Sequence, residues 1–136
     1  MSVAGDAAGS FHAAMLVALR NAASFGGAIN GVFEGPAVKA TAPFAEIGEL
    51  LISDWGTKDR AGSELRSAII IIDRAEGPGR LHRLAAAADA AMATVPRDLP
   101  GWRIASLVLL RSRIVRDGPG AWTALVEHRV RIIESA

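Results

Sequence analysis

Four consecutive isoleucines, Ile69–Ile72, constrain the fold of this chain more than any other feature of its sequence. They lie near the end of an apolar run from Glu64 to Asp73, and Gly77-Pro78-Gly79 stops the pattern soon afterwards. Successive side chains of a strand point to opposite faces of a sheet, so an unbroken apolar run predicts a strand with both faces covered. We therefore expect this segment to lie at the centre of a sheet.

Two helices are predicted from apolar residues that recur at helical spacing. One runs from about Arg80 to Val95, where Pro96 ends it, and it has the strongest periodicity in the chain. The other begins at Ser10, a potential N-cap, and ends before Gly26-Gly27. The residues expected on their buried faces are Leu81, Leu84, Ala85, Ala88, Met92 and Val95 on the first, and Phe11, Met15, Leu19 and Ala22 on the second.

The other apolar segments predict strands. The candidates are Ala28–Phe33, Phe44–Asp54, Glu64–Asp73, Trp102–Arg116 and Ala121–Ile133. Neighbouring strands joined by turns run antiparallel, so the order α-β-β-β-α-β-β predicts an α+β fold: an antiparallel sheet of about five strands with two helices packed on one face. Residues 1–9 are expected to be a loose arm, and residues 10–136 a single domain.

The alternation in the last hairpin predicts which residues share a face of the sheet. Trp102, Ile104, Val108, Leu110 and Ile114, together with Trp122, Val126, Val130 and Ile132, are expected to face the helices. Placing both sets on one side requires an odd number of connecting residues, hence a three- or five-residue loop around Asp117 to Pro119. The opposite face would carry Arg103, Arg111, Arg113, Glu127, Arg129 and Arg131. Glu127 would lie within reach of Arg111 there.

Composition excludes several classes of protein. The 136 residues are 51% hydrophobic and 21% charged, as in an ordinary globular domain. A net charge of +1 is too small to draw the chain onto nucleic acid or an anionic membrane through its bulk field. The absence of cysteine excludes disulfides and thiolate chemistry. Apolar runs such as Ala68–Ile72 are too short to span a membrane, and no positively charged segment precedes Ala13–Leu19 as in a secretory signal, so a cytoplasmic product is expected.

Residues that carry catalysis in other proteins do not fall into functional patterns here. None of the three histidines has a carboxylate or second histidine at i+3 or i+4, the spacing of a metal half-site. Gly77-Pro78-Gly79 opens a helix as in a dinucleotide-binding turn, but His82 occupies the third glycine position. Ser63 is not within a Gly-x-Ser-x-Gly turn. We therefore expect no enzyme activity, and no catalytic, cofactor-binding or metal-binding residues.

Two charged regions are better explained as interaction surfaces. The hairpin tip Trp55–Ser63 exceeds the two to five residues that a hairpin needs, although a mobile surface loop is the alternative. The basic residues of the final hairpin could face phosphates, but stacking aromatics are scarce there and Glu127 interrupts the patch. The candidate interface residues are Trp55, Lys58, Asp59, Arg60, Arg111, Arg113, Glu127, Arg129 and Arg131.

In order and spacing, several short segments resemble the phage tail-completion or tail-terminator family of long-tailed phages and gene transfer agents. They are the N-terminal amphipathic helix, Pro43-Phe44 with Gly48, Asp54-Trp55-Gly56-Thr57-Lys58 with Gly62 and Glu64, the alanine-rich helix, Gly101-Trp102-Arg103-Ile104, Arg116-Asp117-Gly118 and Trp122. The resemblance covers nearly the whole chain after residue 10.

The resemblance implies a structural role. It implies a hexameric ring on the head-proximal end of a tail tube, which stops tube polymerisation and meets the head connector. The implied partners are further copies of the chain, the tube protein and the connector, with no membrane partner, no cofactor, and DNA only in passage through the lumen. The chain would then assemble in the host cytoplasm and become part of the particle. A small α+β enzyme or ligand-binding domain with a site between subunits is the alternative from another class.

Overall fold

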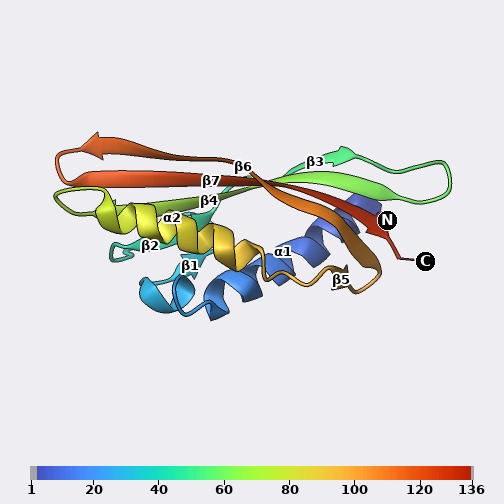
Figure 1. Cartoon of the computed structure of the whole chain (residues 1–136), viewed down its shortest axis with the longest axis horizontal. Helices are drawn as coiled ribbons and strands as arrows, with labels where there is room; N and C mark the ends of the chain where they lie inside the picture. Colours follow the sequence, from blue (N-terminus) through green and yellow to red (C-terminus); the bar gives the residue numbers. More distant parts are fainter. Residues whose placement is uncertain (1–2, 136) are drawn as a thin grey trace.

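A sheet lies over two helices in the computed structural model, which describes residues 3–135 (Figure 1). The elements are α1 (Val3–Asn21), a 3-10 turn (Gly26–Ala28), β1 (Val32–Phe33), β2 (Phe44–Ile47), β3 (Leu51–Asp54), β4 (Gly62–Arg74), α2 (Gly79–Met92), β5 (Asp98–Leu99), β6 (Trp102–Gly118) and β7 (Ala121–Glu134). Both helices cover the same face of the sheet, as predicted, and the opposite face carries no helix within the described residues (Figure 1).

The strand order is β1-β2-β4-β7-β6-β5, with β3 also paired to β4. The predicted central strand is β4, which lies between β7 and the pair β2 and β3. Ile69 and Ile71 are fully buried toward the helices, whereas Ile70 and Ile72 on the opposite face are only partly buried. The central position of the isoleucine run is therefore confirmed, but one face of this strand is not covered within the subunit.

The α+β class is confirmed, but the sheet has seven strands rather than about five, and it is not purely antiparallel. β1 pairs with β2 in parallel. The predicted strand Phe44–Asp54 is divided into β2 and β3, because the pairing with β4 shifts by one residue between Ile47 opposite Ile69 and Leu51 opposite Arg66. Gly48 lies at this break and donates its amide to the carbonyl of Ala68 at 2.8 Å.

The helical faces predicted from periodicity form the core. Phe11, Met15 and Leu19 of α1 are fully buried, and so are Leu81 and Met92 of α2. The expected loose arm is wrong from residue 3 onward, because α1 begins at Val3 and its Ala7 and Ala8 are buried. These small side chains extend the apolar stripe by one turn before Phe11, and packing stabilises a segment whose composition gave little local signal.

Because of bulges in β6, the predicted faces of the last hairpin are correct for some residues and wrong for others. Trp102, Ile104, Val126, Val130 and Ile132 are buried on the helix side as predicted. However, the register shifts between Ile104 and Ser106 and between Leu109 and Arg111. Since directly opposed residues share a face, Val108 opposite Arg129 lies on the outer face, and Leu107 opposite Val130 packs on the core instead. The predicted inward positions of Val108 and Leu110 are therefore wrong.

At the far end of this hairpin the two strands share a face as predicted, but through a different connection. Gly118 is opposite Ala121, so only Pro119 and Gly120 connect the strands, and the predicted three- or five-residue loop is wrong. The shared face is kept because the register shifts between Arg116 and Gly118, where Asp117 is the extra residue. Ile114 and Trp122 both pack against the core, on one face. Gly118 and Gly120 adopt φ values of 145° and 69°, which side chains disfavour.

An ion pair between buried Asp73 and half-exposed Arg80 ties α2 to the end of β4. The carboxylate of Asp73 accepts hydrogen bonds from Nε of Arg80 at 2.9 Å and from the backbone amide of Arg74 at 2.8 Å. The Arg80 guanidinium therefore holds the pKa of Asp73 below its usual value, although burial opposes this shift. The pair fixes the start of α2, where no side chain caps the helix.

We expect Asp73→Asn to lower the free energy of unfolding by about 2–3 kcal/mol at neutral pH, since it weakens a charge-assisted bond in a buried site. Because the folded pKa of Asp73 lies below the unfolded value, its contribution is present above the unfolded pKa and is lost as pH falls through the folded pKa. Urea unfolding of wild type and variant as a function of pH should show the two curves converging in acid. Equal stability of both proteins at pH 7 would contradict this role of Asp73.

Candidate assembly surfaces

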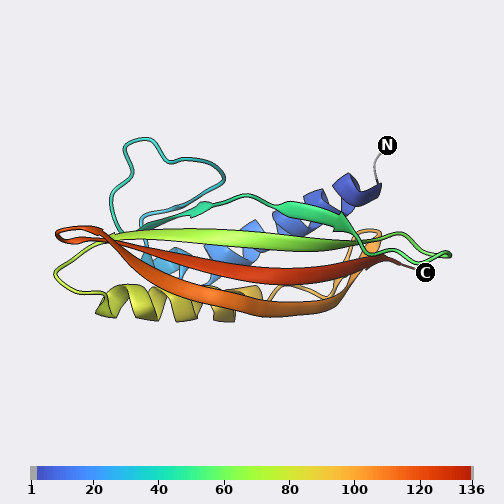
Figure 2. The ribbon, with the colours of Figure 1, turned by 90° about the horizontal axis from the view of Figure 1, so that it is seen from above.

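The hairpin between β3 and β4 is ordered by its own backbone. The Trp55 amide bonds to the carbonyl of Gly62 at 3.0 Å, and the Thr57 amide to the carbonyl of Arg60 at 2.8 Å. The Thr57 hydroxyl accepts hydrogen bonds from the backbone amides of Asp59 at 3.3 Å and Arg60 at 3.1 Å. The predicted tip is thus a narrow hairpin that ends in a tight turn and projects from one end of the subunit (Figure 2).

Charged side chains at this tip are available to another molecule. Lys58, Asp59 and Arg60 are all exposed, and none of them has an ion-pair partner within the described residues. Because the backbone of the tip is already ordered, the binding of a partner to these charged side chains would cost little further conformational entropy. The geometry therefore suits a contact element, which is how the sequence was interpreted.

Trp55 lies at the base of the tip and is partly buried. Its ring is 5.5 Å from the guanidinium carbon of Arg131 on β7, a cation–π contact. Arg131 also donates through Nε to Glu64 at 3.0 Å. The structure thus joins the two charged regions that the sequence presented separately, and it gives Trp55 a positioning role.

The outer face of β6 and β7 carries the predicted charged set. Arg103, Arg111, Arg113, Glu127, Arg129 and Arg131 lie on the side away from the helices, as the pairing of β6 with β7 shows. The predicted contact between Arg111 and Glu127 is present as an ion pair. Because the Arg111 side chain is largely exposed, this ion pair stabilises the fold by only about 0.2–0.5 kcal/mol.

One member of this surface was missed from the sequence. Arg66 of β4 lies directly opposite Arg129 of β7, so two like charges are neighbours on the outer face. Nε of Arg129 is buried and has no hydrogen-bond acceptor within the described residues. Arg66 could have been placed on this face from the sequence, because Glu64, Arg66 and Ala68 alternate along the strand with residues of the buried face. An unfavourable pair of this kind would be relieved by an anionic group on a partner.

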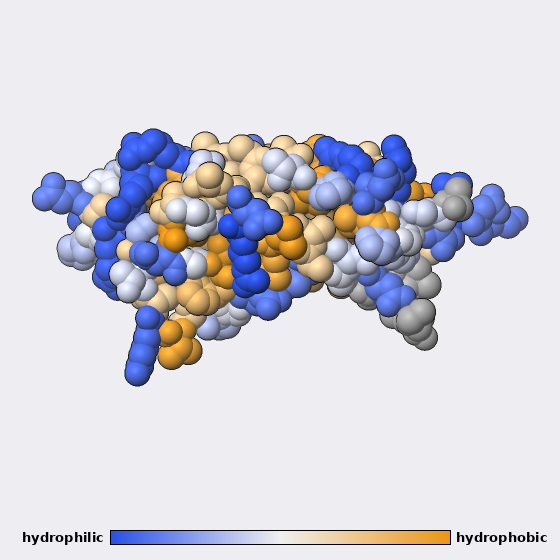
Figure 3. Space-filling view, turned by 90° about the horizontal axis from the view of Figure 1, so that it is seen from below, coloured by the Kyte–Doolittle hydropathy of each residue, from blue (hydrophilic) through white to orange (hydrophobic). Residues whose placement is uncertain are grey.

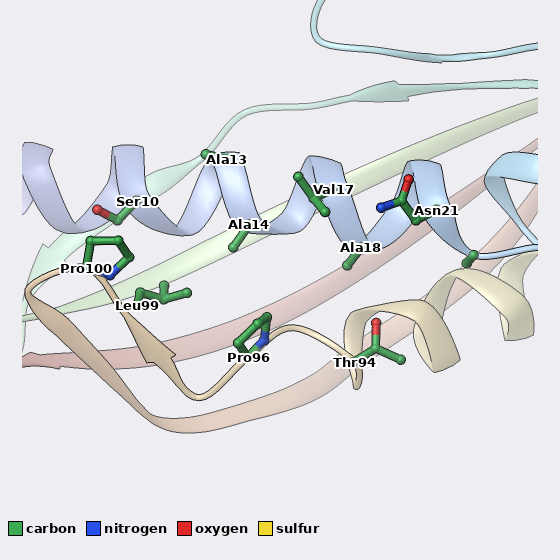
Figure 4. A pocket seen from close by; sticks show the side chains of 11 residues that line it. Ser10, Ala13, Ala14, Val17, Ala18, Asn21, Thr94, Pro96, Leu99 and Pro100 are labelled. Atoms are coloured by element: carbon green, nitrogen blue, oxygen red, sulfur yellow. The ribbon is translucent and has the colours of Figure 1, made fainter.

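The helix-covered face differs in character. Hydrophobic surface makes up much of its centre and is crossed by a hydrophilic band, and strongly hydrophilic tips project at both ends (Figure 3). An open groove of about 710 Å³ runs between α1 and the segment from Thr94 to Pro100 (Figure 4). Small and apolar side chains such as Ala13, Val17 and Leu99 dominate its lining, which contains no titratable group. The groove therefore offers adhesion rather than acid–base chemistry.

Two of the three histidines form separate pairs with carboxylates. Residues 3–135 contain no cluster of three His, Asp or Glu side chains arranged to hold a metal. His128 contacts Asp89 at 2.8 Å, and His12 contacts Glu34 at 2.8 Å, each as a separate pair. None of the described helices is long and apolar enough to cross a membrane.

Comparison with known families identifies the chain. The model of the family described as tail completion protein gp17 matches residues 13–133, nearly the whole domain. The chain belongs to this family. The resemblance found in the sequence is thereby confirmed, and the chain is a tail completion protein, a structural component of a virus-type tail.

A solved structure supports the fold assignment of this family member. A chain from the "Virion of native gene transfer agent (GTA) particle" superimposes with a TM-score of 0.74 and 23% sequence identity, covering 97% of this chain and 99% of that chain. At this identity the likeness establishes a shared fold. No curated protein matches the sequence.

Proposed function

We propose that this tail completion protein is a tail terminator that forms a hexameric ring, caps the head-proximal end of the tail tube and joins it to the head connector. The family match over residues 13–133 carries the proposal. The role is structural and needs no catalytic residue. The ring would assemble in the host cytoplasm and persist in the phage or gene transfer agent particle, with DNA passing through its lumen.

The geometry of the subunit supports this function in two ways. The tip with Lys58, Asp59 and Arg60 projects well beyond the body of the subunit, where it could reach the tube or the connector (Figure 2). The charged outer face of β6 and β7 is broad and lacks a helix within the described residues, so it could line a lumen or a subunit junction. A ring built by rotation needs two different, complementary surfaces on each subunit.

We expect the purified protein at high concentration to have six times the 14.2 kDa subunit mass by light scattering, and to form open six-fold rings by electron microscopy. Addition of tail tubes should place one ring at a tube end and stop further polymerisation. A strictly monomeric protein that leaves tube length unchanged would contradict the proposed function. Binding to DNA with steep salt dependence would instead favour a nucleic-acid role.

A further inference from the structure

Two edges of the sheet are left open within the described chain. β6 has 17 residues, but β5 pairs only with Trp102 and Arg103, and the Ile104 amide then reaches the carbonyl of Arg97. Beyond Ile104 the outer edge of β6 has no strand beside it in residues 3–135. β3 likewise pairs with β4 on one edge only. The two strands lie along opposite margins of the sheet (Figure 2).

Exposed apolar side chains gather on these open edges. Leu51 and Ile52 of β3 are 56% and 46% exposed. On β6, the three consecutive residues Val108, Leu109 and Leu110 are 38%, 43% and 39% exposed. Among the residues whose burial is described, the other large exposed hydrophobics are Val17 and Val38 alone. A long open edge that carries apolar side chains templates pairing with another strand, and natural proteins rarely leave one uncovered.

The charges of the two edges are opposite in sign. On the β3 side, Glu49 and Asp54 are exposed and form no ion pair within the described residues. On the β6 side, Arg111, Arg113 and Arg116 are exposed, and Glu127 neutralises the first of them in part. Pairing β6 with β6 of another copy would bring these arginines together. Pairing β6 with β3 brings arginines toward carboxylates instead.

Strand directions fit the same arrangement. β3 runs antiparallel to β4, β4 to β7, and β7 to β6, so β3 and β6 run in opposite directions. A rotation that preserves strand direction therefore sets β3 of one copy antiparallel to β6 of its neighbour. The four residues of β3 also fit beside the bulge-free stretch of β6 that follows Leu110.

We propose that the partner of these edges is a second copy of this chain: β3 of one subunit adds to the open edge of β6 of the next, so that the sheet continues from subunit to subunit. This inference rests on the proposed ring and names its seam. Each subunit contributes one edge of each kind, which gives the head-to-tail contact that a closed ring requires.

Cysteine cross-linking tests this seam directly, because the chain contains no cysteine of its own. Ser53 is on the outer face of β3, opposite Glu64, and Val108, Arg111 and Arg113 are on the outer face of β6. Ser53→Cys is combined in turn with Val108→Cys, Arg111→Cys and Arg113→Cys. A disulfide needs Cα atoms within about 4–7 Å, so only the variant with the right register should react. The matched control combines Ser53→Cys with Ala13→Cys, an exposed position of α1 on the helix side.

Mild oxidation of one double variant should convert most of the monomer band into a reducible ladder that ends at the ring size, while the single variants and the control stay monomeric on the gel. Electron microscopy of each sample separates the two proposals. Rings without cross-links in any combination would overturn the β3–β6 seam and leave the proposed ring intact. Cross-linked open filaments would support the seam and overturn the ring. The absence of both rings and cross-links would overturn both.

Discussion

The double variant Lys58→Glu/Arg60→Glu is expected to lose attachment to tail tubes while it remains folded. Both side chains are exposed at the end of the β3–β4 hairpin and have no ion-pair partner within the described residues. Reversing them removes no contact in the subunit, so the melting temperature should shift by about 2 °C at most. A partner surface that fits two positive charges would instead meet two negative ones, and like charges across an interface cost several kcal/mol, or roughly a thousandfold in affinity or more.

Co-sedimentation with tail tubes and the yield of completed particles measure this effect. Arg83→Glu/Arg97→Glu is the matched control, since it makes the same change in net charge at exposed positions on the helix side. The control should bind tubes as wild type does. If the tip variant completes tails as well as wild type, the tip is a passive turn and the contact lies elsewhere.

The second large effect is expected at the outer face of β6, where Arg111→Glu/Arg113→Glu should convert rings into folded monomers. Both arginines are exposed, and only Arg111 has an acidic neighbour, Glu127. Loss of that exposed pair costs about half a kcal/mol in the subunit. At a junction with a neighbouring subunit, however, the two new glutamates would be desolvated beside acidic groups. This repulsion would occur at every junction of the ring and would oppose its assembly.

Light scattering reports the ring-to-monomer change, and thermal unfolding verifies that the subunit is intact. A charge swap distinguishes a seam from a lumen: Glu49→Arg added to Arg111→Glu/Arg113→Glu should restore rings in part if β3 faces β6 of the neighbour. Glu49 is exposed. Rings of wild-type mass and stability in the arginine variant would show that this face lines open space.

Features set by short-range pattern were predictable from the sequence. The isoleucine run 69–72 marked a central strand because an unbroken apolar run is typical of strands flanked by other strands, although its outer face is only partly buried here. The spacing of Leu81, Leu84 and Ala88 fixed the buried face of α2, because a helix repeats every 3.6 residues. The alternation along β7 placed Glu127, Arg129 and Arg131 on one face for the same kind of reason. The order of these elements was enough to identify the family.

Features that depend on a distant partner were decided only by the tertiary structure. The bulges of β6 depend on how this strand fits the twist of β7. The register shift between Ile104 and Ser106 moved Val108 to the outer face, and the shift between Leu109 and Arg111 returned Ile114 to the core side. Nothing near Val32 in the sequence specifies a parallel partner at Ala45. Trp55 and Arg131 are far apart in the chain, and β4 and β7 bring them together. The sequence by itself determined the two helices with their buried faces, the central strand and the faces of β7, because local periodicity encodes these features. Only the folded sheet decided which edges, β3 and β6, have no partner within the subunit, because an open edge is a property of the whole set of pairings.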